Sequence, residues 1–442
     1  MDVGIKRVSP GSLAQALEEG PFTAIQIRCV ALAVAAVVLD GFDIQLLGVA
    51  IPGLMREWGV GRAAFVPVLS LGVVAMSLGT WLSGWMGDRL GRRPSLILAM
   101  LLFGGGTLAA AFTHAMGPFL AARLIASLGL GGAMPNAVAL LVEYSPRRHR
   151  SMAVTGGMIC TPLGGVLAGL VAAQLLPTHG WASLFMVGGV APLVLTAVLW
   201  LWLPESAQVL AGKGQRRELA RLAQALNAPV SVLEAAPATV RSSYVDLLRE
   251  GRAMTTLLVW LQFLGVLTAA YTAFNWLPTL LAKAGFALST SSTALAVFNF
   301  GGIAGALLGG VVMTRDGSRR VTIAFALGAV ISSMAVALAL VQGAGAGVVL
   351  ATLTAAGFFI AGLQPMLFAI ASQFYPDRMR ASGVGAALGI GRLGVLISSL
   401  LGATLIGSGA LVYFGFIAGL MAVVAFALLA MTNHVAPVER KG

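Results

Sequence analysis

Charged side chains are scarce in this chain. Asp, Glu, Lys and Arg account for 10% of its 442 residues, whereas a typical soluble domain carries about 25%. The composition therefore excludes an ordinary soluble globular protein. Cysteine is almost absent, and because Cys29 and Cys160 both fall in apolar runs, the sequence excludes a disulfide framework. Histidine is also rare, and its spacing forms no metal-ligand pair.

Two further features are missing. The chain has no glycine-rich phosphate loop followed by Lys and Ser or Thr, which argues against an ATP-driven pump. Residues 1–24 are polar and of mixed charge, without an apolar segment that ends in a small-residue cleavage site, so we expect no removable signal peptide. We expect a protein without cofactors.

Long apolar runs are abundant, since hydrophobic residues make up 58% of the chain. Several of these runs reach the roughly 20 residues that a helix needs to cross a bilayer. They are residues 25–54, 64–86, 94–113, 117–142, 152–176, 182–203, 254–282, 290–313, 321–342, 346–374, 383–407 and 410–432. We therefore predict an all-α membrane protein with twelve transmembrane helices in two pseudo-symmetric six-helix halves.

One long polar stretch, residues 204–253, separates the two halves. Within it, residues 216–222 predict an amphipathic helix, which either is solvated or touches anionic lipid headgroups. The predicted segments are a cytoplasmic N-terminal segment (1–24), a first half (25–203), a cytoplasmic linker (204–253), a second half (254–432) and a cytoplasmic tail (433–442).

The basic residues predict the orientation. If the N-terminus lies in the cytoplasm, 23 of the 28 Lys and Arg residues fall in cytoplasmic segments, as the positive-inside rule requires. Of the other five, three fall in the external loops, and Arg123 and Arg392 lie inside predicted helices. This asymmetry predicts that both termini are cytoplasmic, and it accounts for the net charge of +12 without a nucleic-acid partner.

The two halves repeat each other's patterns. Residues 84–93, at the end of the second predicted helix, have a counterpart in 310–320, and residues 143–150 have one in 374–380. Six-helix halves related by an axis along the membrane normal are a transporter architecture. In that architecture the substrate site lies between the halves, near the middle of the membrane.

Two acidic residues, Asp40 and Asp43, lie deep in the first apolar run. A charge at the bilayer centre costs at least about 2.5–3.5 kcal/mol on insertion scales, so buried acids are functional candidates by default. Their three-residue spacing directs both carboxylates to one helix face. The alternative is a pair of structural carboxylates satisfied by neighbouring helices. We predict that Asp40 and Asp43 couple transport to protons.

Arg392 and Arg123 are the basic counterparts of these acids. Arg392 lies about 15 Å along its predicted helix, where a guanidinium requires an anion. That anion is either a substrate carboxylate or Asp40, and a fixed ion pair between helices is the structural alternative. Arg123 is a substrate-binding candidate whose depth matches that of Asp43, so the two could also pair. Glu143, at a cytoplasmic helix end, is predicted as a proton carrier or as a gate residue.

The stretch after the second predicted helix reads Gly-x-x-x-Asp-Arg-x-Gly-Arg-Arg. We expect Gly84 to allow close approach of two helices and Gly91 to allow a tight turn. Asp88 is expected to pair with arginines or to cap a neighbouring helix. The alternative is generic cytoplasmic positive charge. The predicted cytoplasmic gate comprises Gly84, Asp88, Arg89, Gly91, Arg92, Arg93 and Arg380.

This pattern matches in full the signature motif of the major facilitator superfamily, which the chain resembles. The second-half copy departs from it, because Thr314 stands where the acid would be, which implies a weaker latch on that side. Residues 40–43, 129–136 and 380–394 are similar to the aromatic acid:proton symporter family, whose members carry 4-hydroxybenzoate, benzoate and 3-(3-hydroxyphenyl)propionate. The resemblance implies functional roles for Asp40, Asp43, Glu143, Arg380 and Arg392.

An aromatic substrate needs a flat apolar wall and polar groups for ring hydroxyls. The remaining substrate-binding candidates are the aromatic residues Tyr271, Phe274, Trp276 and Phe298 and the amides Gln45, Asn275, Asn299 and Gln364. An unpaired amide inside the membrane is costly, which favours a pocket role for these amides. The alternative for each aromatic ring is a lipid-facing or core position.

The sequence thus predicts a monomeric symporter of the bacterial inner membrane that imports a small aromatic carboxylate together with protons. Its energy source is expected to be the proton gradient. A proton-coupled drug or metabolite exporter of the same superfamily is the alternative, because residues 157–165 weakly resemble its antiporter motif. In that stretch, however, Thr161 replaces the Gly that precedes Pro. A receptor that binds an aromatic acid and signals is a third hypothesis, although residues 204–253 contain no recognisable partner domain.

Overall fold

The computed structural model describes residues 22–206, 209–210, 215–225, 247–248, 252–375, 380–431 and 434. Helices dominate these residues, and no strand occurs among them. Most of the predicted N-terminal segment, much of the linker and nearly all of the predicted tail lie outside the described residues. The side chains of Asp88 and Arg380 are also outside the description.

The first half consists of five long helices. They are α2 (Ala24–Trp58), α3 (Val66–Arg89), which follows the short 3-10 helix η1 (Arg62–Phe65), α4 (Arg92–Ala110), α5 (Met116–Tyr144) and α6 (Arg147–Trp202). α6 contains 56 residues and turns at Gly180, whose φ of 72° is left-handed. Glycine alone adopts that conformation without strain. The turn divides α6 into two segments, each long enough to cross a membrane.

The second half consists of six long helices. They are α9 (Ala253–Lys283), α10 (Leu288–Asp316), α11 (Ser318–Val341), α12 (Ala346–Phe374), α13 (Arg380–Gly407) and α14 (Ala410–Ala430). In the described residues, eleven helices are long and apolar enough to span a membrane. Because α6 contains two spans, the predicted twelve transmembrane segments are confirmed.

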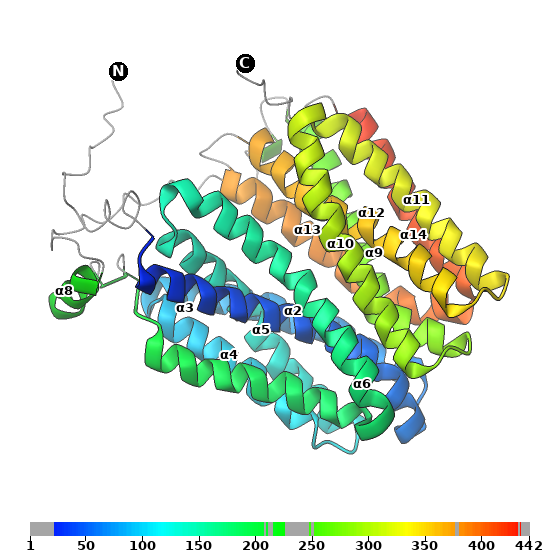
Figure 1. Ribbon diagram of the computed structural model, residues 1–442, viewed down its shortest axis with the longest axis horizontal. Helices are drawn as coiled ribbons and strands as arrows, with labels where there is room; N and C mark the ends of the chain where they lie inside the picture. Colours follow the sequence, from blue (N-terminus) through cyan, green and yellow to red (C-terminus); the bar gives the residue numbers. More distant parts are fainter. Residues whose placement is uncertain are drawn as a thin grey trace.

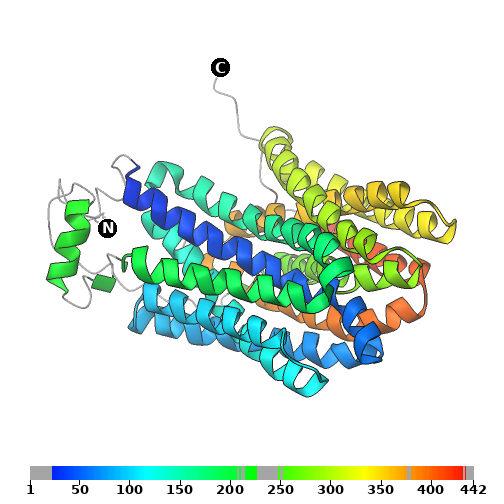
Figure 2. The ribbon, with the colours of Figure 1, turned by 60° about the horizontal axis from the view of Figure 1, so that its bottom comes forward.

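One further helix, α8 (Arg216–Ala225), lies in the linker. Leu219 and Leu222 are buried in a cluster with Leu199 and Leu203 from the end of the first half, whereas Arg217 is exposed. The predicted amphipathic helix is therefore confirmed. It lies beyond one end of the first half (Figures 1 and 2).

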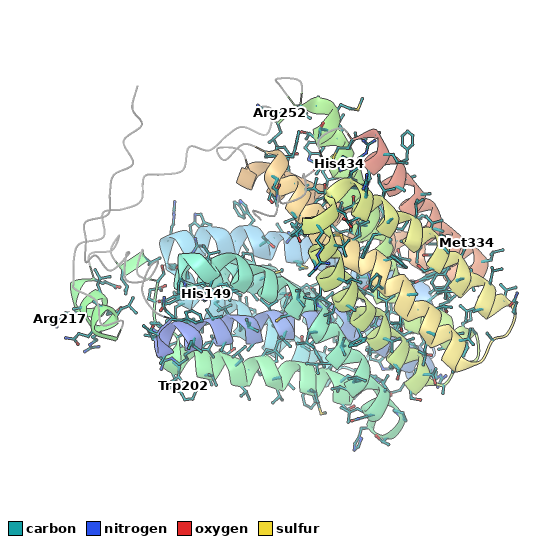
Figure 3. The ribbon with its side chains drawn as sticks, turned by 45° about the horizontal axis from the view of Figure 1, so that its top comes forward. His149, Trp202, Arg217, Arg252, Met334 and His434 are labelled. Carbon is teal, nitrogen blue, oxygen red and sulfur yellow. The ribbon has the colours of Figure 1, made fainter. Side chains whose placement is uncertain are left out.

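The two halves lie side by side, and their contact runs mainly along α2 with α9, α6 with α10, and α3 with α13, with a smaller contact between α2 and α10. We call the helix ends that carry Arg89, Arg92 and Arg315 the basic end, and the other ends the opposite end. Figures 1 and 3 show the halves converging at the opposite end. At the basic end, the group with His149, Trp202 and Arg217 lies well apart from the group with Arg252 and His434 (Figure 3).

Candidate transport site

Asp43 is held in an ion pair inside the first half. Its two oxygens accept hydrogen bonds from Nη1 and Nη2 of Arg123, at 2.9 and 2.8 Å, and one of them also accepts from the Thr107 hydroxyl at 2.9 Å. Asp43 is completely buried and Arg123 is 5% exposed. The Arg123 guanidinium also stacks 5.6 Å from the ring centre of Phe185. The expected Asp43–Arg123 pair is therefore confirmed, in a bidentate geometry.

Asp40 has a different environment, although it lies one helical turn away. Its side chain is completely buried, and neither carboxylate oxygen has a hydrogen-bond partner among the described residues. The next residue, Gly41, lies so close to Thr161 of α6 that a Cβ at Gly41 would collide with the Thr161 backbone. The Asp40 carboxylate, which has no hydrogen-bond partner among the described residues, thus lies next to a close backbone contact between α2 and α6.

Arg392 of α13 reaches across the interface between the halves. Its Nη2 donates a hydrogen bond to the Thr80 hydroxyl of α3 at 3.0 Å. The Thr80 hydroxyl is itself 2.9 Å from the Met76 carbonyl and 2.8 Å from the Gly131 carbonyl. Since a hydroxyl has one proton to donate, these carbonyls engage that proton and a lone pair is left to accept from Arg392. The Thr80 hydroxyl therefore acts as a fixed acceptor.

Arg392 retains binding capacity for an anion. A guanidinium has five N–H donors, and the hydrogen bond to Thr80 uses one of them. Arg392 is half-buried, its charge interacts with that of Asp40, and it lies near the neutral Tyr271 side chain. The structure thus places a partly exposed cation near the unpartnered acid.

Two glycines fix the backbone that carries Arg392. A Cβ on Gly391 would collide with Leu267 of α9, and one on Gly394 would collide with Thr268. The absence of side chains at these two positions lets α13 pack directly against α9. Residues 391–394, the last part of the 380–394 stretch noted in the sequence, therefore have a structural role, because their two glycines hold the Arg392 segment of α13 against α9.

Three of the predicted aromatic residues form a continuous series near this arginine. Tyr271 and Phe274 pack edge to face with ring centres 5.5 Å apart, and Phe274 and Phe298 do so at 6.0 Å. Tyr271 and Phe274 are half-buried, whereas Phe298 is 2% exposed. The exposed faces of Tyr271 and Phe274 make them the most accessible part of this series.

Trp276 lies elsewhere in the second half. It is completely buried, donates its indole N–H to the Ser398 carbonyl at 3.2 Å and occupies the space that a side chain at Gly402 would need. In this conformation Trp276 packs α9 against α13.

The predicted amides have three different environments. Gln45 and Asn299 hydrogen-bond each other across the two halves, at 2.9 and 2.6 Å. Asn275 is 4% exposed beside the tight contact of α9 with Gly48 of α2. Gln364 of α12 is half-buried.

Comparison with known proteins identifies the family. The sequence matches the model of the Major Facilitator Superfamily over residues 33–386 and 285–442. It is 37% identical to the 4-hydroxybenzoate transporter of Pseudomonas putida, with 89% of both chains covered. It is 36% identical to a gallate transporter of the same species, over 89% of this chain and 88% of that protein.

The chain belongs to the major facilitator superfamily, and within it to the aromatic acid:proton symporter family. The members named above are transporters, and this protein is a transporter rather than an enzyme. Its fold is similar to that of the xylose transporter of Escherichia coli in an inward open conformation, with a TM-score of 0.72 at 16% identity, over 94% of this chain and 98% of that one.

The superfamily's signature motif lies at the basic end of the first half. Gly91 has a φ of 118°, and a Cβ there would collide with the Glu205 carboxylate. Glycine is therefore required at position 91 for two reasons, which supports its predicted role in a tight turn. Gly84 differs from the expectation, because nothing lies within 4 Å of the position its Cβ would occupy. In this conformation no second helix of the described residues contacts it.

The arginines of the motif bind acids and aromatic rings. Arg92 lies 3.6 Å from the Glu143 carboxylate, and the Arg93 backbone N–H donates to Glu205 at 3.2 Å. The guanidinium of Arg89 stacks on the Trp85 ring, 4.7 Å from its centre. Glu143 is thus joined to the signature motif, consistent with a gate role.

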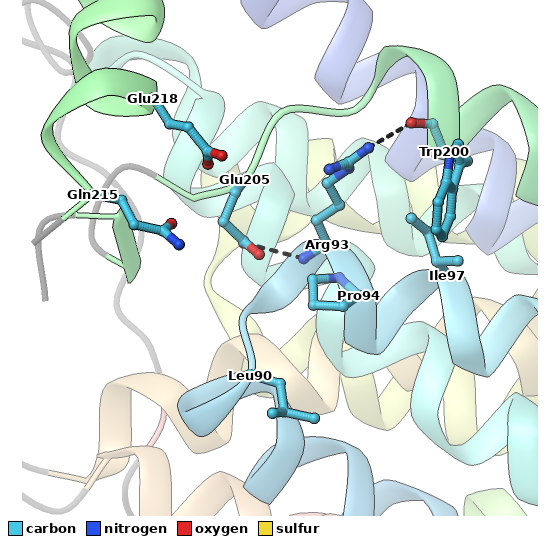
Figure 4. Close-up of a pocket in the computed structure, with 8 residues that line it drawn as sticks. All are labelled: Leu90, Arg93, Pro94, Ile97, Trp200, Glu205, Gln215 and Glu218. Carbon is cyan, nitrogen blue, oxygen red and sulfur yellow. Dashed lines mark hydrogen bonds between the residues drawn. The ribbon is translucent and has the colours of Figure 1, made fainter. Parts of the chain in front are cut away.

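A shallow pocket of about 270 Å³ opens beside this motif. Figure 4 shows it between the start of α4, the end of α6 and α8, with Arg93 donating to the Trp200 carbonyl. Its lining residues are Leu90, Arg93, Pro94, Ile97, Trp200, Glu205, Gln215 and Glu218. The pocket lies at the basic end, whereas Asp40 and Arg392 lie midway along their helices. It is therefore separate from the site around Asp40 and Arg392, which we call the central site.

Sequence reasoning missed Glu205 and Thr80. Glu205 carried a usable signal, because it is one of sixteen acids and follows the last span of the first half directly. Thr80 carried none, since a helical threonine usually bonds its own backbone and nothing in its neighbours distinguishes it.

Proposed function

We propose that this protein imports a small aromatic carboxylate, of the hydroxybenzoate or hydroxyphenylpropionate type, in symport with protons across the bacterial inner membrane. One observation carries the proposal: Asp40 is completely buried and, within the described part of the chain, has no hydrogen-bond partner, and its charge interacts with that of the half-buried Arg392. The relatives named as 4-hydroxybenzoate and gallate transporters support the substrate class.

The proton is carried by Asp40 in this proposal. An ionised carboxylate buried without a partner is far more costly than a neutral acid, so the site favours binding of a proton there. Asp43 is a weaker candidate, because it already accepts three hydrogen bonds and pairs with Arg123. The two predicted acids therefore have separate roles, with Asp40 in coupling and Asp43 in structure.

The substrate carboxylate binds Arg392. Ionised Asp40 attracts the guanidinium, and protonation of Asp40 removes that competing charge. The planar guanidinium then binds the carboxylate in bidentate fashion, and the ring lies against Tyr271 and Phe274. One proton and one carboxylate together add no net charge, which favours movement of the loaded site through the membrane.

The structure corresponds to a carrier open toward the basic end. Close contacts between the halves occur at Gly48 with Phe274 and at Gly169 with Ala296, both toward the opposite end. At the basic end no atom of the described residues lies within 4 Å of a Cβ built on Gly84, and the halves diverge (Figure 3). If the basic end faces the cytoplasm, as the positive-inside rule predicts, this is an inward-facing conformation, and Gly84 meets its partner helix when the halves rock.

Arg392→Gln is expected to reduce kcat/KM for 4-hydroxybenzoate uptake by about 30-fold or more, because loss of one partner from a desolvated charge pair costs at least about 2 kcal/mol. Proteoliposome uptake of radiolabelled acid measures this, with Arg315→Gln at the exposed basic end as the matched control.

Excess 4-hydroxybenzamide, which lacks the charge, should not compete. Competition by the amide, or full activity of Arg392→Gln, would refute carboxylate recognition by Arg392. A cation exporter has no use for this arginine.

A further inference from the structure

The Gln45–Asn299 pair is a reciprocal hydrogen-bonded link between the halves. Gln45 of α2 donates from Nε2 to Asn299 Oδ1 at 2.9 Å, and Asn299 of α10 donates from Nδ2 to Gln45 Oε1 at 2.6 Å. Asn299 Nδ2 also donates to the Leu295 carbonyl at 2.8 Å. Gln45 is 2% exposed and Asn299 is completely buried. Neither amide is accessible to a substrate in this conformation.

The pair lies at the inner margin of the region where the halves are closed. One turn farther toward the opposite end, Gly48 packs on the Phe274 carbonyl of α9, and Gly169 packs on Ala296 and the Ser292 carbonyl of α10. These contacts join backbone to backbone and leave no room for a side chain. The Gln45 amide is also confined by Gly165 of α6, where a Cβ would collide with it.

Alternating access requires this region to open during every cycle. The packing contacts at these glycines are non-directional, whereas a buried amide pair is directional and costly to leave unsatisfied. The Gln45–Asn299 pair therefore stabilises the conformation that is closed at the opposite end more than the glycine contacts around it do.

We propose that Gln45 and Asn299 are the gate residues on the external side, and that their amide pair must break for the site to face outward. The inference rests on the proposed transport function. It assigns the two amides to control of access rather than to contact with a ring hydroxyl, since they are sealed from the site in the closed state.

The test replaces both amides with apolar side chains of similar size, Gln45→Met with Asn299→Leu, so that neither is left buried without a partner. The reporter is Ser292→Cys, which lies completely buried in the closed region, in a background with Cys29→Ser and Cys160→Ser. We expect an impermeant maleimide applied from outside to label the reporter about tenfold faster in the double variant, which corresponds to about 1.4 kcal/mol. An unchanged or slower rate would overturn the proposal.

Asn136→Leu is the matched control, because Asn136 is a buried amide that bonds Ser83 and Ser95 within the first half alone. It should leave the labelling rate unchanged, and an equal increase would also overturn the proposal. Labelling requires no substrate, so failed uptake of aromatic acids with faster labelling would refute the proposed function and leave the gate intact.

A second measurement does not depend on the stability of the double variant. In Gln45→Cys with Asn299→Cys, a short cleavable thiol cross-linker should stop transport, and its cleavage should restore transport. Transport that continues while the cross-link is intact would show that the two residues do not separate, and would overturn the proposal.

Discussion

Asp40→Asn is expected to abolish proton-driven accumulation of the substrate while preserving exchange of internal for external substrate. Asparagine has nearly the shape of a protonated aspartate, so the site should remain in its proton-loaded form. A carrier fixed in this form binds substrate and reorients when loaded, but it has no proton to release. Accumulation ratios in proteoliposomes with an imposed pH gradient measure the first effect, and counterflow measures the second.

The matched control is Asp316→Asn, which makes the same substitution at an exposed site at the basic end of α10. It should accumulate substrate as the unmodified protein does. Asp40 would lose its role as the proton carrier if Asp40→Asn still concentrated the substrate against its gradient. Loss of counterflow as well would point to a structural role.

Asp43→Ala is expected to destabilise the protein by about 3–5 kcal/mol, because it leaves the Arg123 guanidinium buried without its carboxylate. Asp43 is completely buried and Arg123 is 5% exposed, so water cannot replace the lost partner. For a chain of 442 residues we expect the thermal midpoint in detergent to fall by about 3–5 °C. The neighbouring ring of Phe185 compensates for only part of the loss.

Simultaneous replacement of both partners separates charge from packing. Asp43→Leu with Arg123→Leu removes the two charges together, and buried ion pairs replaced in this way often lose little stability. We expect the double variant to be more stable than either single change. A double variant that is as unstable as the sum of both singles would show that the pair contributes no coupling and would refute its structural role.

The helices could be predicted from the sequence because each spanning helix must satisfy its own backbone in lipid. Every predicted apolar run corresponds to a helical segment of the structure. The ends were harder, because polar extensions beyond the membrane leave no hydropathy signal. α2 extends to Trp58, past the predicted end at residue 54, and α6 continues as one helix through Gly180.

An ion pair of the site could be predicted from the sequence where the depth of two charged residues in the membrane is enough to match them. Asp43 and Arg123 lie at matching depths in neighbouring helices, and they pair. The Gln45–Asn299 pair was not predictable, because it joins residues 254 positions apart and depends on how the halves meet in one conformation. Trp276 shows the same limit, since its sequence position says nothing about which face of α9 lies against α13.

Accumulation of radiolabelled 4-hydroxybenzoate in proteoliposomes, with an inward proton gradient imposed and then collapsed by an uncoupler, tests the central claim most directly. The account predicts uptake above the level of equilibration, followed by loss of the accumulated acid when the gradient is removed. Uptake that reaches the same level with and without the gradient would contradict proton symport. Gradient-dependent loss of a lipophilic cation, without uptake of the acid, would contradict the whole assignment.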